Sequence, residues 1–141
     1  MVIAVDFDGT IVEHMYPEIG KEIPFAVVTL KTLAKEGHTL ILWSCREGKL
    51  LDDAVQWCKA RGLEFYAYNR DTPDSSYSPT DGGRKLRADL FIDDRNVGGL
   101  PDWGVIYDVV HNGISFAEYY RRQSEVVPEK KGFWAKLKNS K

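Results

Sequence analysis

The stretch that decides the fold is VIAVDFDGT, residues 2–10 of the chain. Its first four residues are all apolar, which predicts a short strand buried on both faces at the centre of a sheet. The five residues that follow include two aspartates and a glycine, and these residue types favour a sharp turn. A buried strand that runs straight into carboxylates is typical of an open parallel α/β sheet, where ligands bind at the carboxyl ends of the strands.

The rest of the chain alternates short β-branched or aromatic runs with helix-like stretches, which is the pattern of a parallel α/β domain. We expect further strands at residues 39–43, 65–68, 90–92 and 105–107, and helices at 24–36, 50–61 and 114–122. Together with residues 2–5, these runs predict a mainly parallel five-stranded sheet. At 141 residues the chain has room for one such core.

Composition excludes several classes of function. A formal net charge of −2 gives no basic field to attract nucleic acid, so no nucleic-acid partner is expected. No apolar stretch approaches the ~18 residues that span a bilayer, so no membrane partner is expected. Two cysteines can form at most one disulfide, which is too few to stabilise a domain of this size. Nothing in the sequence indicates export, so we expect a cytoplasmic protein.

Residues 124–141 differ in composition from the expected domain, residues 1–123. This tail holds five lysines against two glutamates and places Phe133 and Leu137 four residues apart, on one face of a helix. We expect a solvated end or a short docking helix, and weak binding to a membrane surface or a partner is the alternative.

Carboxylates follow two of the predicted strands at the point where each strand ends. Asp6 and Asp8 follow the first strand, and the pair Asp93 and Asp94 follows the strand at residues 90–92. In a parallel sheet these four carboxylates meet at one edge, where they repel one another unless a cation lies among them. A hard divalent ion with oxygen ligands fits such a site, so Mg²⁺ is the expected cofactor and all four carboxylates are expected ligands.

Together with Ser44 and Lys85, these residues resemble the four motifs of the haloacid dehalogenase (HAD) superfamily of phosphohydrolases. Residues 6–10 resemble the first motif, Ser44 the second, Lys85 the third, and Asp93 with Asp94 the fourth. The resemblance covers residues 1–122, and the run from 85 to 95 is similar to the compact arrangement in small HAD phosphatases. It implies a single Rossmann-like, HAD-type three-layer domain that hydrolyses phosphate esters.

Phosphoryl transfer needs an attacking group, a proton donor and charge neutralisation around the phosphate oxygens. Asp6 is the candidate nucleophile and would form an aspartyl-phosphate intermediate. Asp8 would protonate the leaving alkoxide and later take a proton from the hydrolytic water. By resemblance, an acid at this position distinguishes phosphatases and phosphomutases from HAD dehalogenases and ATPases, and the backbone carbonyl of Asp8 also faces the metal. The sequence therefore predicts a phosphomonoester hydrolase.

Four residues are expected to bind the phosphate group. Ser44 would donate a hydrogen bond to it, and Lys85 would take part in catalysis by neutralising its charge and separating the carboxylates. Gly9 and Thr10, in the turn after the first strand, complete the set. By resemblance, Asp93 is a more direct metal ligand than the residue that follows it.

Two loops flank the expected site, and neither is long enough to form a cap domain. They span residues 9–23 and 69–84. Because no lid can close over the substrate, the site is expected to be open, and water must be excluded by the substrate, by these loops or by a neighbouring copy in a homo-oligomer. The expected substrate is a phosphorylated small molecule or macromolecule.

Loop residues supply the expected substrate contacts. His14 and Tyr16 lie in the first loop, and Asn69 begins the second. Arg46 would either clamp an anion with its two-pronged guanidinium or pair with Glu47 in solvent. The first loop, the second loop and the residues after Ser44 therefore carry the candidates for substrate selection.

Two other functions remain compatible with these residues. A receiver-like signalling module, phosphorylated on aspartate without turnover, also combines an acidic pair, a hydroxyl, a lysine and Mg²⁺. Receivers place the acidic pair after the first strand and the phosphate acceptor after the third, whereas this chain has its adjacent acidic pair late in the sequence. A scaffold of the same fold that binds phosphate or a partner without hydrolysis is the other alternative.

Overall fold

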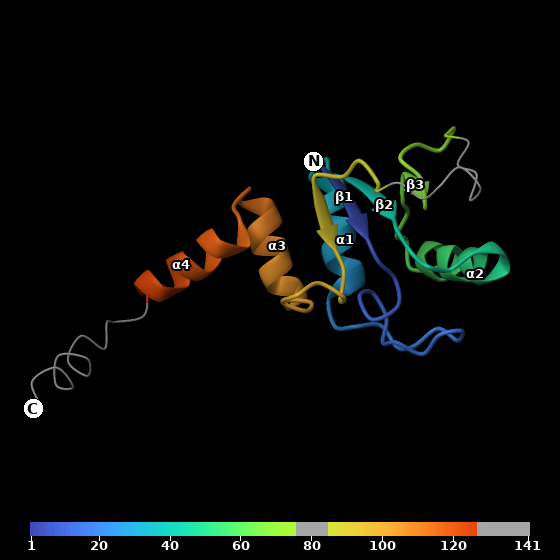
Figure 1. Ribbon diagram of the computed structural model, residues 1–141, viewed down its shortest axis with the longest axis horizontal. Helices are drawn as coiled ribbons and strands as arrows, with labels where there is room; N and C mark the ends of the chain where they lie inside the picture. The colour runs from blue at the N-terminus through green and yellow to red at the C-terminus, as the bar shows by residue number, and fades with distance from the viewer. Residues whose placement is uncertain (76–84, 127–141) are drawn as a thin grey trace, which may run out of the picture. The chain divides into compact units, whose positions relative to one another are not determined.

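A computed structural model describes residues 1–75 and 85–126, in which strands and helices alternate along most of the chain (Figure 1). The strands are β1 (Val2–Val5), β2 (Thr39–Leu42), β3 (Ala67–Tyr68) and β4 (Leu90–Ile92), and the helices are α1 (Ala26–Lys35), α2 (Gly48–Lys59), α3 (Trp103–His111) and α4 (Phe116–Val126). The expected strands at 2–5, 39–43, 65–68 and 90–92 are present, although β3 begins later than expected. The expected helices at 24–36, 50–61 and 114–122 are present as α1, α2 and α4.

The four strands are parallel in the order β3-β2-β1-β4, so β1 is paired on both sides. Val5, the last residue of β1, lies in register with Leu42 on one side and Ile92 on the other. Hydrogen bonds extend this register past the strands, from the Asp6 N–H to the Ile92 carbonyl (3.0 Å) and from the Trp43 N–H to the Val5 carbonyl (2.8 Å). Three strands therefore end together, and the residues that follow them share one edge of the sheet.

Apolar side chains cover both faces of the sheet, as a parallel sheet requires. Successive residues point to opposite faces, so Ala4 and Ile41 pack with Leu86 on one face. Ile3 and Val5 point to the other face and are both 0% exposed. Figure 1 shows α1 running alongside the sheet, and α1 contacts β2. The central strand is therefore fixed by burial on both faces as well as by pairing at both edges.

The fifth strand expected at residues 105–107 is wrong, because these residues belong to α3 and the described sheet has four strands. Their β-branched and aromatic side chains favour a strand in isolation. The buried residues around them instead recur at helical spacing, as Trp103, Ile106 and Val110 show. Gly113, with φ +60°, then ends the helix by donating its N–H to the Val110 carbonyl (3.1 Å).

The chain forms two compact units, residues 1–107 and residues 108–141. The expected boundary between residues 123 and 124 stays a prediction. Residues 76–84 of the second loop and residues 127–141 of the basic tail lie outside the described residues. None of the described helices has the length and apolar composition that crossing a membrane requires.

Candidate functional site

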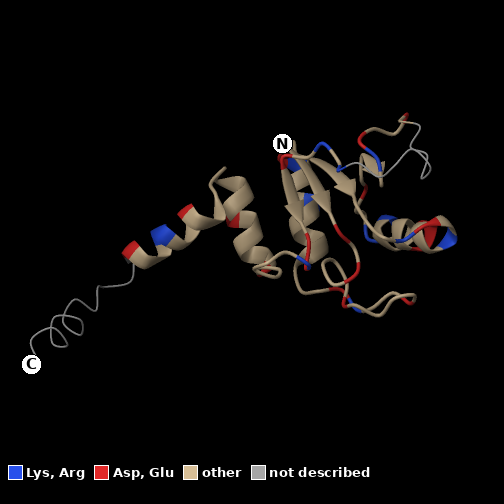
Figure 2. Cartoon of the chain, in the orientation of Figure 1, with Lys and Arg blue, Asp and Glu red and all other residues tan. Residues whose placement is uncertain are grey.

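Three carboxylates meet at the carboxyl edge of the sheet. Asp6 follows β1, whereas Asp93 and Asp94 follow β4, and one oxygen of each residue lies within 4.8 Å of an oxygen of the other two. Figure 2 shows acidic segments, in red, where the neighbouring strands β1 and β4 end. The paired ends of these two strands bring together residues that are far apart in the sequence, and the resulting cluster could hold a metal ion.

The electrostatics of the cluster are clearest at Asp6. Burial raises the pKa of this carboxyl from 3.8 to about 7, because desolvation disfavours the charged form. A hydrogen bond from the Phe7 backbone opposes this rise, and the negative charges of Asp93 and Asp94 add to it. The three carboxylates therefore destabilise one another when all of them are ionised, and a cation among them would remove that cost.

Thr10 joins two members of the cluster. Its side chain is fully buried, and its hydroxyl donates to Oδ2 of Asp6 (3.2 Å) and accepts the N–H of Asp94 (3.1 Å). The Thr10 carbonyl in turn accepts the indole N–H of Trp103 (3.1 Å). Thr10, which the sequence predicts as a phosphate-binding residue, thus uses its hydroxyl to orient the carboxylates.

Gly9 is needed where the chain passes close to Asp94. Its φ of +83° lies in the left-handed region, and a Cβ at this position would lie 2.7 Å from Cγ of Asp94 and closer still to Oδ2. The Gly9 N–H donates to the Val12 carbonyl (2.7 Å) within the turn. Any larger residue would push the Asp94 carboxylate away from the cluster.

The cluster also contains an unsatisfied atom. Oδ1 of Asp94 is buried and has no hydrogen-bond partner among residues 1–75 and 85–126. Buried carboxylate oxygens are normally paired with a donor or a cation, because an unpaired one is costly. Three carboxylates that offer hard oxygen atoms suit Mg²⁺ better than softer metals. The residues present therefore fit a divalent cation held by Asp6, Asp93 and Asp94.

Asp8, the fourth expected ligand, has a different partner. Its carboxylate forms a two-pronged ion pair with Arg46, with 2.7 Å from Oδ2 to Nε and 2.7 Å from Oδ1 to Nη2. The Asp8 side chain is 12% exposed and the Arg46 side chain only 1% exposed. The hydrogen bonds that Arg46 donates to Asp8 raise the pKa of the Arg46 guanidinium, because they stabilise its charged form. Asp8 is therefore beside the three-carboxylate cluster, and its side chain is not part of it.

The loop after β2 is held by Asn69. The Ser44 N–H donates to Oδ1 of Asn69 (2.8 Å), and Nδ2 of Asn69 donates to the Arg46 carbonyl (3.1 Å). The Arg46 N–H donates to the Ser44 hydroxyl oxygen (3.1 Å). Asn69 and Arg46, which the sequence predicts as substrate contacts, thus bind neighbouring parts of the protein.

A cavity of about 370 Å³ lies beside the cluster. Its walls come from the ends of β1 and β4, the loop after β2 and the first loop, and the lining residues are Asp6, Asp8, His14, Tyr16, Ser44, Cys45, Asp93 and Arg95. This volume suits a phosphate group with a small organic substituent, since pockets for small ligands start at roughly 300 Å³. Most of the expected site residues that line it are acidic or can donate a hydrogen bond.

Lys85 lies apart from this lining. It is exposed, and its ammonium nitrogen is 4.7 Å from the centre of the Phe91 ring. Phe91 belongs to β4, so Lys85 approaches the strand that carries the acidic pair, as the sequence places it. Lys85 is not among the described residues that line the cavity.

Two cavity-lining residues were not expected from the sequence. Cys45 is exposed and lines the cavity. Arg95 also lines the cavity, and its N–H donates to Oδ1 of Asp93 (2.8 Å). Each of them directly follows an expected site residue, Ser44 or Asp94. Their position next to an expected site residue is the sequence feature from which they could have been predicted.

No protein-family model matches the chain, and a search of curated proteins gives no match. Among solved structures, the chain is similar to a conserved protein from Bacteroides thetaiotaomicron, with a TM-score of 0.78 and 65% sequence identity. The match covers 85% of this chain and 97% of the Bacteroides chain. With this identity over nearly the whole of that protein, the chain belongs to the same family as the conserved Bacteroides protein.

Proposed function

We propose that this protein is a Mg²⁺-dependent phosphomonoester hydrolase of the HAD type that works through an aspartyl-phosphate intermediate. The observation that carries the proposal is the convergence of Asp6, Asp93 and Asp94 within 4.8 Å at the carboxyl edge of a parallel sheet. These residues come from the first and fourth of the motifs that resemble the HAD superfamily. Ser44, from the second, lines the cavity beside them.

The three clustered carboxylates would hold the ion, because they converge at one point and leave a buried oxygen of Asp94 without a donor in the described part of the chain. When bound, Mg²⁺ would neutralise charge on the phosphate oxygens and keep Asp6 ionised. An ionised Asp6 matters because a carboxyl group with a pKa of about 7 is partly protonated, and the protonated form is a poor nucleophile.

In the first half of the reaction, an oxygen of Asp6 attacks phosphorus in line with the ester bond. A bond forms between that oxygen and phosphorus, while the bond from phosphorus to the ester oxygen breaks and its electron pair leaves with the alkoxide. Asp8, which lines the same cavity, gives its proton to the alkoxide. The Ser44 hydroxyl would donate a hydrogen bond to a phosphate oxygen.

In the second half, a water molecule attacks the phosphorus of the aspartyl-phosphate. Asp8, now ionised, takes a proton from that water as the new oxygen–phosphorus bond forms. The bond between phosphorus and Asp6 breaks, which regenerates the carboxylate and releases inorganic phosphate. One residue therefore serves as acid and then as base, and no proton is left unaccounted for.

The proposal is tested by phosphate release from 4-nitrophenyl phosphate with Mg²⁺ and with EDTA. We expect EDTA to abolish release and both Asp6→Asn and Asp93→Asn to lower it by at least ~10³-fold, since they remove the nucleophile and a metal ligand. Asp52→Asn is the matched control, because Asp52 is an exposed aspartate on α2. Activity that survives both EDTA and Asp6→Asn contradicts the proposal.

The same assay separates the receiver-like alternative. A stable phosphoryl group on Asp6 with no turnover would favour a signalling module. Binding of Mg²⁺ without hydrolysis across a broad panel of phosphate esters would favour a binding scaffold instead.

A further inference from the structure

Arg46 carries a positive charge into the interior beside the proposed site. Its side chain is 1% exposed, and all five of its N–H groups have acceptors. Nε and Nη2 each donate to one oxygen of Asp8 at 2.7 Å. The other three donate to backbone carbonyls, those of Pro17 (3.0 Å), Glu18 (2.9 Å) and, most weakly, Leu50 (3.5 Å). The guanidinium is therefore used to hold the protein rather than a substrate.

The partners of Arg46 come from separate walls of the cavity. Asp8 belongs to the turn after β1, whereas two of the carbonyls belong to the flap, which we define as residues 13–21. The base of the flap is closed by its own backbone, since the Glu13 N–H donates to the Lys21 carbonyl (2.8 Å). Arg46 fastens the tip of the flap to the interior of the protein.

Two aromatic rings adjoin the same guanidinium. Its central carbon lies 5.3 Å from the ring centre of Phe7 and 5.3 Å from that of Tyr16, distances at which a cation attracts an aromatic face. Tyr16 belongs to the flap and lines the cavity together with His14. Arg46 therefore helps to position the two flap side chains that face the cavity.

Arg46 is itself held from outside the flap. Asn69 donates to the Arg46 carbonyl and accepts the Ser44 N–H, so it fixes the loop on both sides of Cys45. Asn69 has a φ of +53°, a left-handed conformation that asparagine adopts more readily than most residues. The end of β3 thus supports the loop that carries the guanidinium.

We propose that Arg46 is a positioning residue that fixes the Asp8 carboxylate and the flap as one unit on two sides of the cavity. The inference rests on the proposed function, in which Asp8 donates a proton to the leaving group and then accepts one from water. Arg46 donates to both oxygens of Asp8 and leaves each oxygen a further position, which serves for the O–H that Asp8 donates to the leaving group and later for the proton that it takes from water. Arg46 acts through Asp8 and Tyr16 and does not touch the substrate.

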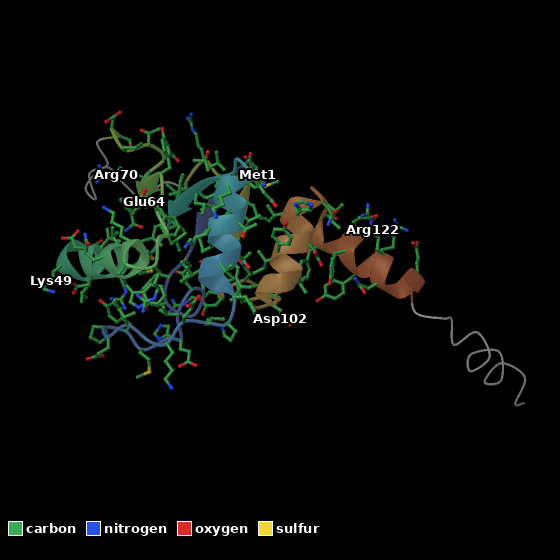
Figure 3. All side chains as sticks on the ribbon, turned by 180° about the vertical axis from the view of Figure 1, so that it is seen from behind. Met1, Lys49, Glu64, Arg70, Asp102 and Arg122 are labelled. Carbon is green, nitrogen blue, oxygen red and sulfur yellow. The ribbon has the colours of Figure 1, made fainter. Side chains whose placement is uncertain are left out.

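Whether Arg46 holds the flap in place is tested by digestion with a glutamate-specific protease in the absence of substrate. Because Arg46 donates to the Glu18 carbonyl, the peptide bond after Glu18 is held in the folded protein. Arg46→Lys keeps a positive charge but cannot form the two-pronged pair. We expect it to raise cleavage after Glu18 by at least ~10-fold, since protease cuts the open form of a segment. Cleavage after Glu64, an exposed glutamate labelled in Figure 3, should stay unchanged.

The matched control is Lys49→Gln. Lys49, also labelled in Figure 3, lies at the start of α2 and pairs with Asp53 on its own helix (2.8 Å). Its loss removes a nearby positive charge without touching the flap, so cleavage after Glu18 should match that of the wild type. Equal cleavage after Glu18 in wild type and Arg46→Lys overturns the proposal. An equal rise after Glu18 and Glu64 overturns it too, because that shows general loosening.

The effect on Asp8 is tested by comparing two substrates. The 4-nitrophenolate group leaves with little protonation, whereas an alkoxide from propyl phosphate needs a proton donor. We expect Arg46→Lys to lower kcat/KM for propyl phosphate at least ~10-fold more than kcat/KM for 4-nitrophenyl phosphate, because kcat/KM reports the step in which the leaving group departs and excludes the later hydrolysis that both substrates share. Asp8→Asn supplies the reference pattern. Equal losses on both substrates would mean a merely structural role and overturn the proposal.

The two measurements separate this inference from the proposed function. If the wild type hydrolyses neither ester, the proposed function fails, while proteolysis still decides whether Arg46 holds the flap. If Arg46→Lys does not fold, Asn69→Gly replaces it, because glycine keeps the left-handed backbone and removes both hydrogen bonds. We then expect cleavage after Glu18 to rise a few-fold, and an unchanged rate overturns the proposal.

Discussion

Asp6 combines a role in the proposed chemistry with a cost to the folded protein. Its pKa rises from 3.8 to about 7 on folding, so the folded state holds its proton more tightly than the unfolded chain does. Stability therefore falls as the pH rises from about 4 through 7, because the unfolded chain gives up the proton first. The whole shift corresponds to about 4 kcal/mol, and partial solvent screening lowers the real effect.

Asp6→Asn should accordingly stabilise the metal-free protein in alkaline solution. We expect the free energy of unfolding to rise by about 1–3 kcal/mol at pH 8 in EDTA and to change little at pH 4, where Asp6 is already protonated in the fold. Urea unfolding at the two pH values measures this difference. A gain of the same size at both would show that the charge of Asp6 is not its cause.

Gly9→Ala should damage the site and the fold together. An alanine there would adopt an unfavourable left-handed φ and press on the Asp94 carboxylate. We expect a loss of about 1–3 kcal/mol in the free energy of unfolding and weaker Mg²⁺ binding. Gly98→Ala is the control, because within residues 1–75 and 85–126 no atom outside its chain neighbours lies within 4 Å of a Cβ at that position. Equal stability of the two variants would mean that the close approach to Asp94 has no energetic weight.

Among individual residues, the sequence predicts the three clustered carboxylates but not the partner of Asp8. Asp6, Asp93 and Asp94 follow their strands directly, so parallel pairing alone brings them together. The pairing of Asp8 with Arg46 depends on the paths of the flap and of the loop after β2. Local residue patterns do not encode those paths, because they are set by long-range packing.

Among the elements, the buried strands and three of the four described helices were predictable, whereas α3 was predicted to be a strand. Strands β1, β2 and β4 are short apolar runs next to turn residues, which is a strong local signal. Residues 105–107 carry the same kind of run, yet they lie in α3, where helical spacing from Trp103 to Val110 prevails. A three-residue window cannot separate these cases, since a buried helix and a buried strand look alike over that length.

The helical state of α3 leads to a stability prediction. Gly104 is the second residue of α3, and a Cβ there would meet no atom of the other described segments within 4 Å. Gly104→Ala should therefore raise the free energy of unfolding by about 0.5–1 kcal/mol, because alanine loses less backbone freedom in a helix. Thermal unfolding measures the gain. A loss of stability would argue that residues 103–111 are not helical in solution.

For the molecule as a whole, the cluster links metal binding to folding. Asp6 and Asp93 follow different strands, so the ion would bind only when β1 and β4 are paired. Binding to the folded state alone contributes about 2.7 kcal/mol when the Mg²⁺ concentration is 100 times Kd. Because Asp6 must lose a proton first, the affinity should fall by up to about tenfold per pH unit below 7.

Thermal unfolding over a series of Mg²⁺ concentrations tests this linkage. We expect a clear rise in Tm at pH 8, a smaller one at pH 5.5, and none with Asp93→Asn, which lacks one of the three carboxylates. An identical rise at both pH values would show that no proton is displaced. An identical rise in Asp93→Asn would show that the ion binds elsewhere.

The short strand β1, Val2–Val5, has a neighbour on each side and carries the first acidic residue directly after it. A shift of one residue in its pairing with β4 would turn Asp6 to the opposite face of the sheet, away from Asp93. Such misregistered molecules would still bury apolar side chains, since β1 is apolar on both faces. The number of magnesium ions bound per chain would thus count the correctly assembled fraction in a refolded sample.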